Sequence, residues 1–529
     1  MDTLFRCFRM WSADPRTVFG IVGLLIGGLG VMLMLVGAFP LGVINLVFFT
    51  LLLFLIALYR PNWGFLGLVA VLPFETVNLL PASVSIALRP YQWIFLIVAL
   101  ALAVRVVSRR TPWSLFRLTS LDVLLALIPL GAGVSGLMAG GAGVHNAVIL
   151  ASFFALYLLG RVFLRTPGDI GVAATVLAAS GLVSLSFGIA QNIAFEHGQN
   201  LAAVMPGRPN GTFAEPDWLG LFAVIILLLL LARLTPASRD RSDTLVDQLP
   251  SIVLLALPLT LVIVTLILTV SRSAWLAACV AIISWASALL IARGKAAISL
   301  VLQSARVLVI VFGLALLIVV DIPLTRFDLL NRAGSTATGL QEITVACPIL
   351  TTLPTEIASV DDLRSFGCRH IDLEERATLA ALGQSIQTIH RPDPNVVIRS
   401  SIYQRSWEEI RSHPVFGIGW GNIGTVLGRD EHGAAYNASN LWFEVWLGAG
   451  IIGLLGLAGA IGLVAVRGVR LLARDVRPEP GRTHLPITLS LLAAFLVFNF
   501  FNAGLLIGFV WIGFACLPVL LSDTVAERV

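Results

Sequence analysis

Charged residues are scarce in this sequence of 529 residues. Asp, Glu, Lys and Arg make up only 12% of it, whereas a soluble domain carries about 25%. Hydrophobic residues make up 57%, and the mean hydropathy is +0.92. This composition excludes a soluble enzyme and indicates a polytopic integral membrane protein.

Lysine is nearly absent, and so are the common nucleotide-binding and metal-binding motifs. Lys295 is the only lysine, and the net charge of +5 comes from arginines in short loops, which is not a nucleic-acid-binding pattern. There is no metal-ligand spacing, no phosphate-binding loop and no dinucleotide-binding fingerprint. We therefore expect no cofactor, no metal and no nucleic-acid partner. Energy has to come from an activated substrate or an ion gradient.

Cysteine is also rare, with five residues in the chain. Cys7, Cys279 and Cys516 lie at the N-terminus or inside apolar runs, whereas Cys347 and Cys368 fall in one long polar stretch. If that stretch lies outside the cytoplasm, these two can form a disulfide; the alternative is two free thiols.

Apolar runs long enough to cross a membrane recur from Val18 to Leu521. They predict an all-α polytopic membrane protein with about 14 transmembrane helices. The first run is long for a signal peptide, so we expect an uncleaved first helix. The predicted division is 1–322 with about eleven transmembrane helices, 323–440 as a loop domain, and 441–529 with about three. The expected spans are 18–38, 41–59, 63–80, 91–107, 121–140, 145–163, 169–194, 217–234, 250–270, 274–292, 306–322, 441–466, 485–503 and 505–522.

Clusters of basic residues predict the orientation. Every cluster follows an even-numbered span, so all lie on one side, which the positive-inside rule assigns to the cytoplasm. Both termini are then cytoplasmic, and residues 195–216, the turn at Arg272 and the 323–440 loop are extracytoplasmic. The clusters are Arg105, Arg109, Arg110 and Arg117; Arg161 and Arg165; Arg233, Arg239 and Arg241; Arg293 and Lys295; and Arg467, Arg470, Arg474, Arg477 and Arg482.

The large loop is expected to be helical. Leu373–Ile389 has two acidic residues in its first turn, which favours a helix start. Ser400–Ser412 has the spacing of an amphipathic helix, and the following His413-Pro414 ends it. We expect such a loop to lie on the membrane and to roof a cavity.

Three arginines lie beside span ends on the predicted outer side, where the positive-inside rule disfavours them: Arg208, Arg272 and Arg399. A guanidinium group is always charged and fork-shaped, so it suits bidentate phosphate binding. The alternative is that these side chains only reach toward the membrane interface. We expect Arg208 and Arg272 to converge on one anionic headgroup.

Several other polar residues flank the outer span ends. Glu215 and Asp217 follow Arg208 and are either a base or partners that hold it. Glu444, one turn into a span, is costly to bury, so we expect it to face a cavity or an arginine. The remaining candidates are His432, Tyr436, Ser439 and Asn440, with His145 and Asn146 as weaker ones.

Three elements together resemble the O-antigen ligase and O-antigen polymerase family. The first is Arg208–Phe213 followed by Glu215-Pro216-Asp217, and the second is Ser271–Ala274. The third begins at Arg399, with an aromatic at Tyr403, and continues through His413–Gly421, Asn440–Glu444 and Gly450–Gly453. The family places a histidine directly before its Asn-Leu-x-x-Glu run, and this chain has Ser439 there. Serine cannot act as an imidazole base.

The resemblance implies a metal-independent, inverting membrane glycosyltransferase in cell-surface polysaccharide (lipopolysaccharide) biosynthesis, at the outer face of the bacterial inner membrane. Its donor would be a glycan linked to polyprenyl (undecaprenyl) diphosphate, and its acceptor a glycan or a lipid-A core. Arg208, Arg272 and Arg399 would bind the diphosphate. Ser439 stands at the position of the catalytic histidine; either His432, Tyr436 or an acid such as Asp217 acts in its place, or the chain uses another step or is inactive. Glu215, Asn440 and Glu444 would support the site.

Three other functions remain open on the sequence. A transporter or flippase of lipid-linked glycan also needs arginines in a cavity, although it needs no large roof and commonly shows two related halves. The others are a non-catalytic envelope scaffold and a peptidoglycan polymerase of the shape, elongation, division and sporulation type.

Overall fold

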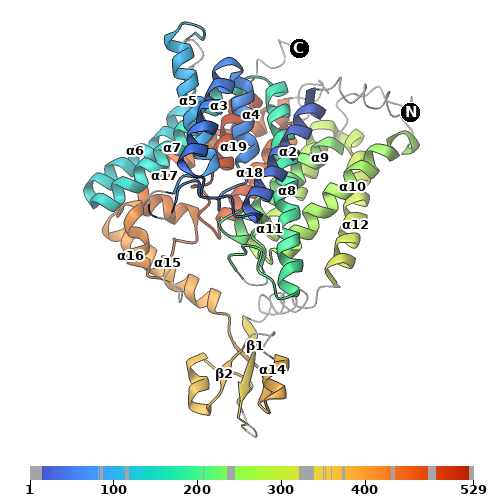
Figure 1. The fold of residues 1–529 in the computed structure, drawn as a ribbon, viewed down its shortest axis with the longest axis vertical. Helices are drawn as coiled ribbons and strands as arrows, with labels where there is room; N and C mark the ends of the chain where they lie inside the picture. Colours follow the sequence, from blue (N-terminus) through green and yellow to red (C-terminus); the bar gives the residue numbers. More distant parts are fainter. Residues whose placement is uncertain are drawn as a thin grey trace. The chain divides into compact units, whose positions relative to one another are not determined.

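The computed structural model describes residues 15–81, 83, 87–112, 118–205, 208–234, 245–320, 339–348, 351, 353–358, 360–371, 376–429, 435–474 and 484–522. The chain forms two compact units: a helical unit of residues 1–316 and 409–529, and a small unit of residues 317–408 (Figure 1). Residues 409–440, predicted as the end of the loop, therefore belong to the helical unit.

Each of the fourteen predicted spans overlaps one described apolar helix. By length and composition, eight segments of the described chain qualify to cross a membrane, one of which holds both α11 and α12; the other apolar helices are shorter. A multi-pass membrane protein is confirmed, and the number of crossings stays a prediction. The helices are α2 (Pro15–Leu35), α3 (Val43–Tyr59), α4 (Pro61–Val71), α5 (Pro90–Val107), α6 (Ser120–Ala139), α7 (Gly141–Phe163), α8 (Pro167–Glu196), α9 (Pro216–Leu234), α10 (Leu245–Leu268), α11 (Arg272–Arg293), α12 (Ile298–Val320), α17 (Leu441–Arg474), α18 (Leu485–Asn499) and α19 (Gly508–Leu520).

The third predicted span, 63–80, is wrong in its second half. Helix α4 has 11 residues and ends at Val71. A helix of that length covers about 16 Å, roughly half of a hydrocarbon core. Pro73 cannot continue the helix hydrogen-bond ladder. The next residues instead bond to a distant loop, because the backbone N–H groups of Glu75 and Thr76 donate to the carbonyl of Thr212 at 2.9 and 3.1 Å.

The helix ends of the helical unit are divided here into two sets by the residues that they carry. At one end, Arg161 of α7 pairs with Asp122 of α6 at 3.2 Å. Arg105, at the end of α5, donates to the carbonyl of Leu58 in α3 at 2.8 Å. Arg105, Arg161, Arg233 and Arg293 lie in the last turns of α5, α7, α9 and α11, and we call these helix ends the arginine-rich end. The starts of α9, α11, α17 and α19 form the opposite set, which we call the site end.

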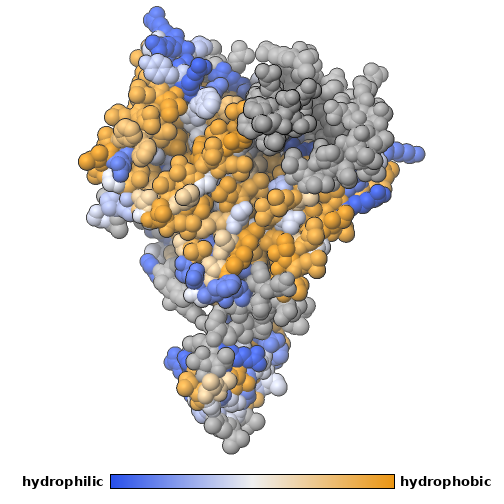
Figure 2. All heavy atoms as spheres, turned by 45° about the vertical axis from the view of Figure 1, so that its right-hand side comes forward, coloured by the Kyte–Doolittle hydropathy of each residue, from blue (hydrophilic) through white to orange (hydrophobic). Residues whose placement is uncertain are grey.

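The surface of the helical unit fits a lipid environment. In Figure 2 its visible face is largely hydrophobic across the middle, with hydrophilic atoms at the upper left and along the lower edge of this band. Many large apolar side chains of α3 and α12 are exposed. Inside the unit, α6 packs against α7 and α17, α2 against α8, and α11 against α18 (Figure 1).

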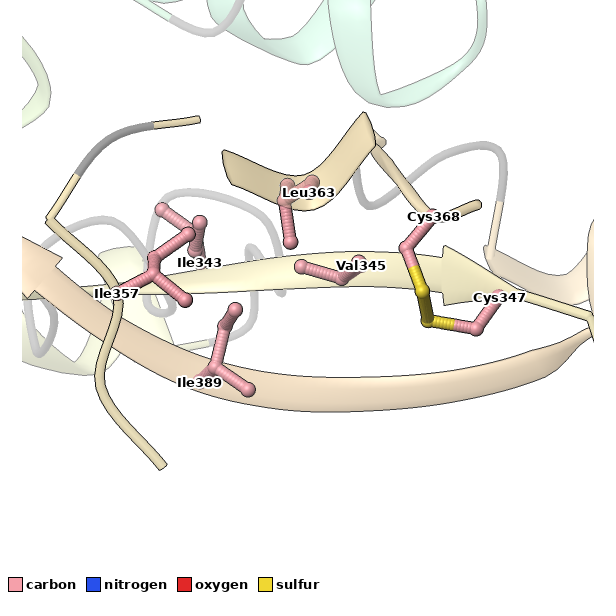
Figure 3. Packing of buried hydrophobic residues seen from close by; sticks show 7 residues of the cluster. All are labelled: Ile343, Val345, Cys347, Ile357, Leu363, Cys368 and Ile389. Atoms are coloured by element: carbon pink, nitrogen blue, oxygen red, sulfur yellow. A yellow bond between two sulfur atoms is a disulfide. The ribbon is translucent and has the colours of Figure 1, made fainter. Parts of the chain in front are cut away.

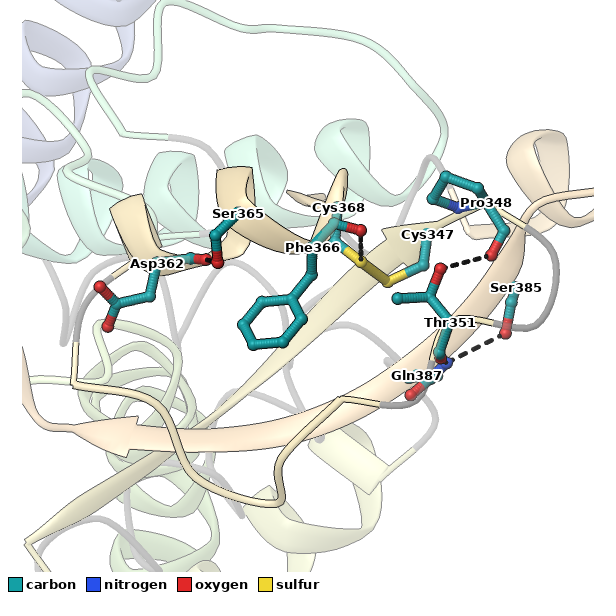
Figure 4. Close-up of a disulfide and its surroundings, with 9 residues drawn as sticks. All are labelled: Cys347, Pro348, Thr351, Asp362, Ser365, Phe366, Cys368, Ser385 and Gln387. Carbon is teal, nitrogen blue, oxygen red and sulfur yellow. Dashed lines mark hydrogen bonds between the residues drawn. A yellow bond between two sulfur atoms is a disulfide. The ribbon is translucent and has the colours of Figure 1, made fainter.

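The small unit is built on a three-stranded antiparallel sheet in the order β2-β1-β3. Strand β1 is Leu340–Cys347, β2 is Arg369–His370 and β3 is Ser385–Pro392. A short 3-10 helix, η3 (Val360–Phe366), covers one face, where the side chains of Ile343, Val345, Ile357, Leu363 and Ile389 form the core (Figure 3). A disulfide joins Cys347 to Cys368 with their Cα atoms 4.3 Å apart (Figure 4).

The expectation of an all-helical loop is therefore wrong. Within predicted helix Leu373–Ile389, the described helix α14 covers only Arg376–Ala381, and the second half is strand β3. Gly383 has a φ of +81°, which ends the helix. Isoleucine and threonine after it favour a strand, and Ile389 pairs with Ile343 of β1.

The second predicted helix of the loop is confirmed. It is α15 (Pro394–Ser412), which begins earlier than the predicted Ser400. Beyond it, the chain forms the short helices η5 (Trp420–Asn422) and α16 (Ile423–Leu427) before it enters α17.

Candidate functional site

Arg208 lies between α8 and α9, and its guanidinium group contacts three neighbouring residues. Its Nε donates to the carbonyl of Thr269 at 3.0 Å, and its Nη1 lies 3.8 Å from the sulfur of Met205. Its Nη2 pairs with Asp217 at 3.5 Å. The side chain is 15% exposed, so the cation is oriented in advance while part of it can reach a ligand.

The rest of the Arg208–Phe213 element is structural. Asn210 is fully buried and donates to the carbonyl of Phe213 at 2.6 Å. Thr212, also fully buried, donates from its hydroxyl to the carbonyl of Pro73 at 2.6 Å. Gly211 has a φ of +57°, and a Cβ there would lie 2.9 Å from a backbone oxygen of α8. The Asn, Gly and Thr positions thus build the loop that presents Arg208.

Asp217 joins this loop to the start of α11. Besides Arg208, its Oδ1 accepts a hydrogen bond from the hydroxyl of Ser271, the N-cap residue of α11. Arg272 is the next residue and the first of that helix, and its side chain is half-buried. The turn before it contains Val270 at a φ of +49°, a costly conformation for a β-branched residue. The first two motifs therefore meet at one carboxylate.

The loop between α18 and α19 links α11 to α17. The side-chain amide of Asn502 donates to the hydroxyl of Ser273 at 2.9 Å and to the carbonyl of Phe498 at 3.0 Å. In the same loop, the carbonyl of Phe500 accepts from the side-chain amide of Asn440 at 3.0 Å. A chain of polar contacts and a short stretch of backbone thus connects Arg208, through Asp217 and the α11 start, to the α17 start.

Glu444 braces the turn that leads into α17. It is 6% exposed; its Oε1 accepts from the indole N–H of Trp420 at 2.8 Å, and its Oε2 accepts from the backbone N–H of Ala438 at 2.7 Å. We predicted that it faces a cavity or an arginine, but both oxygens bind these neutral donors. The next residue after Ala438 is Ser439, with a φ of +49°, so the glutamate holds the strained turn at Ser439.

A kink in α17 explains the glycine-rich third element. Gly450 has a φ of +64° and interrupts the helix. The interruption frees backbone groups, and the chain before η5 pairs with them: Ile451 N–H donates to the carbonyl of Val415 at 3.0 Å, and Ile418 N–H donates to that of Leu447 at 2.8 Å. The His413–Gly421 segment is thereby docked onto the kink.

A comparison with known families matches residues 257–458 to the O-antigen ligase family. This matched segment, called the ligase domain below, covers less than half of the chain. No curated protein matches the chain. The domain supports a membrane glycosyltransferase-like role in polysaccharide biosynthesis. It includes Ser271 and Glu444, whereas Asp217 and Asn502, which bond to the ligase domain, lie outside the matched range.

Other predicted residues lie on α7, on α15 and shortly before α17. His432 lies outside the described residues. Tyr436 is half-buried, and its backbone N–H donates to the carbonyl of Gly428 at 2.9 Å. His145 and Asn146 lie in the first turns of α7. Arg399 and Tyr403 lie one turn apart on α15 in the small unit; burial raises the pKa of the Tyr403 hydroxyl, and Arg399 opposes that rise.

The surroundings of Glu215 shift the pKa of its carboxyl group. Burial raises the pKa of its carboxyl group above the ordinary value, the negative charge of Asp217 raises it further, and Arg208 opposes the rise. It precedes α9 and is half-buried. A carboxyl group of this kind takes up a proton more readily than an exposed one.

Sequence reasoning missed Asn502, Gln191 and Glu75. Asn502 lies in an Asn-Phe-Phe-Asn run between apolar helices, and Gln191 is the buried glutamine of α8 whose Oε1 accepts from Gly211 N–H at 2.7 Å. A polar residue within apolar segments was the available signal in each case. The partner of each residue could not be read from its position in the sequence.

Proposed function

We propose that this protein is a membrane glycosyltransferase that transfers or polymerises glycan from a polyprenyl-diphosphate-linked donor onto a sugar hydroxyl. One observation carries the proposal: Asp217 binds both Arg208 and Ser271, the residue before Arg272. Two arginine-bearing elements, far apart in sequence, are thereby held next to each other. Such an arrangement suits a ligand with two adjacent phosphates.

The chemistry needs little beyond charge stabilisation and one proton acceptor. The acceptor hydroxyl attacks the anomeric carbon with inversion, and the bond from that carbon to the phosphate oxygen breaks. Arg208 and Arg272 stabilise the negative charge on the departing diphosphate. Arg399 is a further candidate for this role. Because Oδ1 of Asp217 already accepts two hydrogen bonds, we assign Asp217 to orienting Arg208 rather than to proton transfer.

We propose that the site end of the helical unit faces the outer side of the bacterial inner membrane. The arginine clusters at the opposite ends of the helices support this orientation through the positive-inside rule. The disulfide between Cys347 and Cys368 also supports it, because such bonds persist in oxidising compartments. Both termini are then cytoplasmic, and the small unit is extracytoplasmic.

The test is deletion of the gene in the source bacterium, followed by analysis of surface glycans and of lipid-linked glycans. We expect lipid-linked glycan to accumulate, and we expect wild-type protein and Arg110→Ala to restore transfer. Arg110 is an exposed arginine after α5, so it controls for loss of charge alone. Arg208→Ala and Arg272→Ala should insert normally and fail to restore transfer. Unchanged glycans in the deletion strain, or full restoration by both variants, would overturn the proposal.

A further inference from the structure

Glu75 is a buried carboxyl group that lies outside the helices, between α4 and α5. Its side chain is 4% exposed. Its backbone N–H donates to the carbonyl of Thr212 at 2.9 Å, and its carboxylate accepts a hydrogen bond from the backbone of Ala214. It therefore packs directly against the loop that carries Arg208 and leads into Glu215.

One oxygen of this carboxyl group makes no hydrogen bond to the described chain. Oε1 of Glu75 is buried and has no hydrogen-bond partner, and no salt bridge holds the group, in the part of the chain that the structure describes. An unpaired buried acceptor is disfavoured, and its presence calls for a water, a ligand or a chemical role. A purely structural residue here would be better served by an amide or an apolar side chain.

The groups that face Glu75 come from two elements. Arg89 and Tyr91 lie at the start of α5, and Glu215 precedes α9. Burial raises the pKa of Glu75 to about 7, the charge of Glu215 adds to the rise, and Arg89 and the Ala214 N–H oppose it. The carboxyl group is thus ionised above about pH 7 and protonated below it, a range suited to proton transfer.

We propose that Glu75 is the proton acceptor of the transfer reaction, in place of the imidazole that Ser439 cannot supply. This inference rests on the proposed glycosyl transfer. As the acceptor oxygen bonds to the anomeric carbon, its proton passes to Oε1 of Glu75 through one water, because this oxygen is buried. The bond to the phosphate oxygen breaks, and its electron pair leaves with the diphosphate. Protonated Glu75 later returns the proton to solvent.

The test compares Glu75→Gln and Glu75→Asp with wild-type full-length protein. The substrate is the lipid-linked glycan that accumulates in membranes of the deletion strain, together with the natural acceptor from the same strain. The glutamine keeps the shape and an acceptor for the Ala214 N–H but cannot titrate. Asp169→Asn, at the capped start of α8, removes a carboxylate distant in the sequence and serves as the control.

We expect the wild-type transfer rate to rise with pH through about 7. Glu75→Gln should lower the rate by about 100-fold or more, the scale of general-base catalysis, and should abolish the rise. Glu75→Asp should transfer more slowly than wild type but keep a rising profile, and Asp169→Asn should match wild type. A Glu75→Gln rate within about two-fold of wild type with the same profile would overturn the inference.

The wild-type profile tests the inference even if a variant fails to accumulate. A rate that does not change between about pH 5 and pH 9 overturns it without any substitution. Failure of the proposed function looks different, because then the wild-type protein transfers no glycan at any pH.

Discussion

Asp217 of α9 accepts a hydrogen bond from Ser271, the N-cap residue of α11. These residues are 54 positions apart in the sequence, and Asp217 also pairs with Arg208. The bond sets the spacing between the two elements that carry Arg208 and Arg272. Its disruption should therefore affect ligand binding more than it affects the fold.

Asp217→Asn should reduce glycan transfer by about 10-fold to 100-fold, because the amide loses the charge that pairs with Arg208 but keeps an acceptor for Ser271. Asp217→Leu removes both contacts and should reduce transfer further. The measurement is glycan transfer at matched protein amounts in the membrane. If Asp217→Leu transferred glycan as fast as wild type, the contacts of Asp217 with Arg208 and Ser271 would not be needed for transfer.

Asn502→Asp should weaken transfer and lower thermal stability by about 1–3 kcal/mol, because the carboxylate cannot donate to Ser273 or to the Phe498 carbonyl. Asn62→Asp, an exposed asparagine in the first turn of α4, is the matched control. Thermal unfolding in detergent and glycan transfer provide the two readouts. Equal unfolding temperatures for the two variants would show that the hydrogen bonds of Asn502 do not stabilise the protein.

Gly450→Ala should prevent accumulation of folded protein. A Cβ at Gly450 would lie 2.2 Å from the carbonyl oxygen of Val415, and its φ of +64° is unfavourable for alanine. Gly462→Ala in the same helix has nothing within 4 Å of the added carbon, so it should accumulate normally. Quantified membrane protein for the two variants gives the answer, and similar amounts would argue against the kink.

The Cys347–Cys368 disulfide should form in the cell and should be absent from reduced protein. The expected result is alkylation of both cysteines only after reduction, measured by mass spectrometry of the purified chain. Replacing both with serine should destabilise the small unit by about 3 kcal/mol, because the bond closes a loop of 21 residues. Cys279→Ser, an exposed free cysteine, is the control. Alkylation without reduction would place the small unit in a reducing compartment.

The prediction of β3 as a helix shows where local reasoning fails. Ser385–Pro392 follows acidic residues that favour a helix start, and no neighbouring residue indicates that it pairs with another strand. The deciding interaction is its pairing with β1, whose residues lie 38 to 52 positions earlier than their partners. The early end of α4 has the same origin, because Glu75 and Thr76 bond to Thr212.

The sequence alone determined that the chain is a multi-pass membrane protein, which helices are apolar, where the arginine clusters lie and which three motifs could form a site. These properties depend on residue type and spacing along the chain, and lipid selects for them directly. Only the tertiary structure decided that Asp217 meets Ser271, that Asn502 meets Ser273, and that Glu75 lies behind the Arg208 loop. Such pairings depend on how helices pack against one another, because a buried polar group takes whichever partner the packing brings within reach.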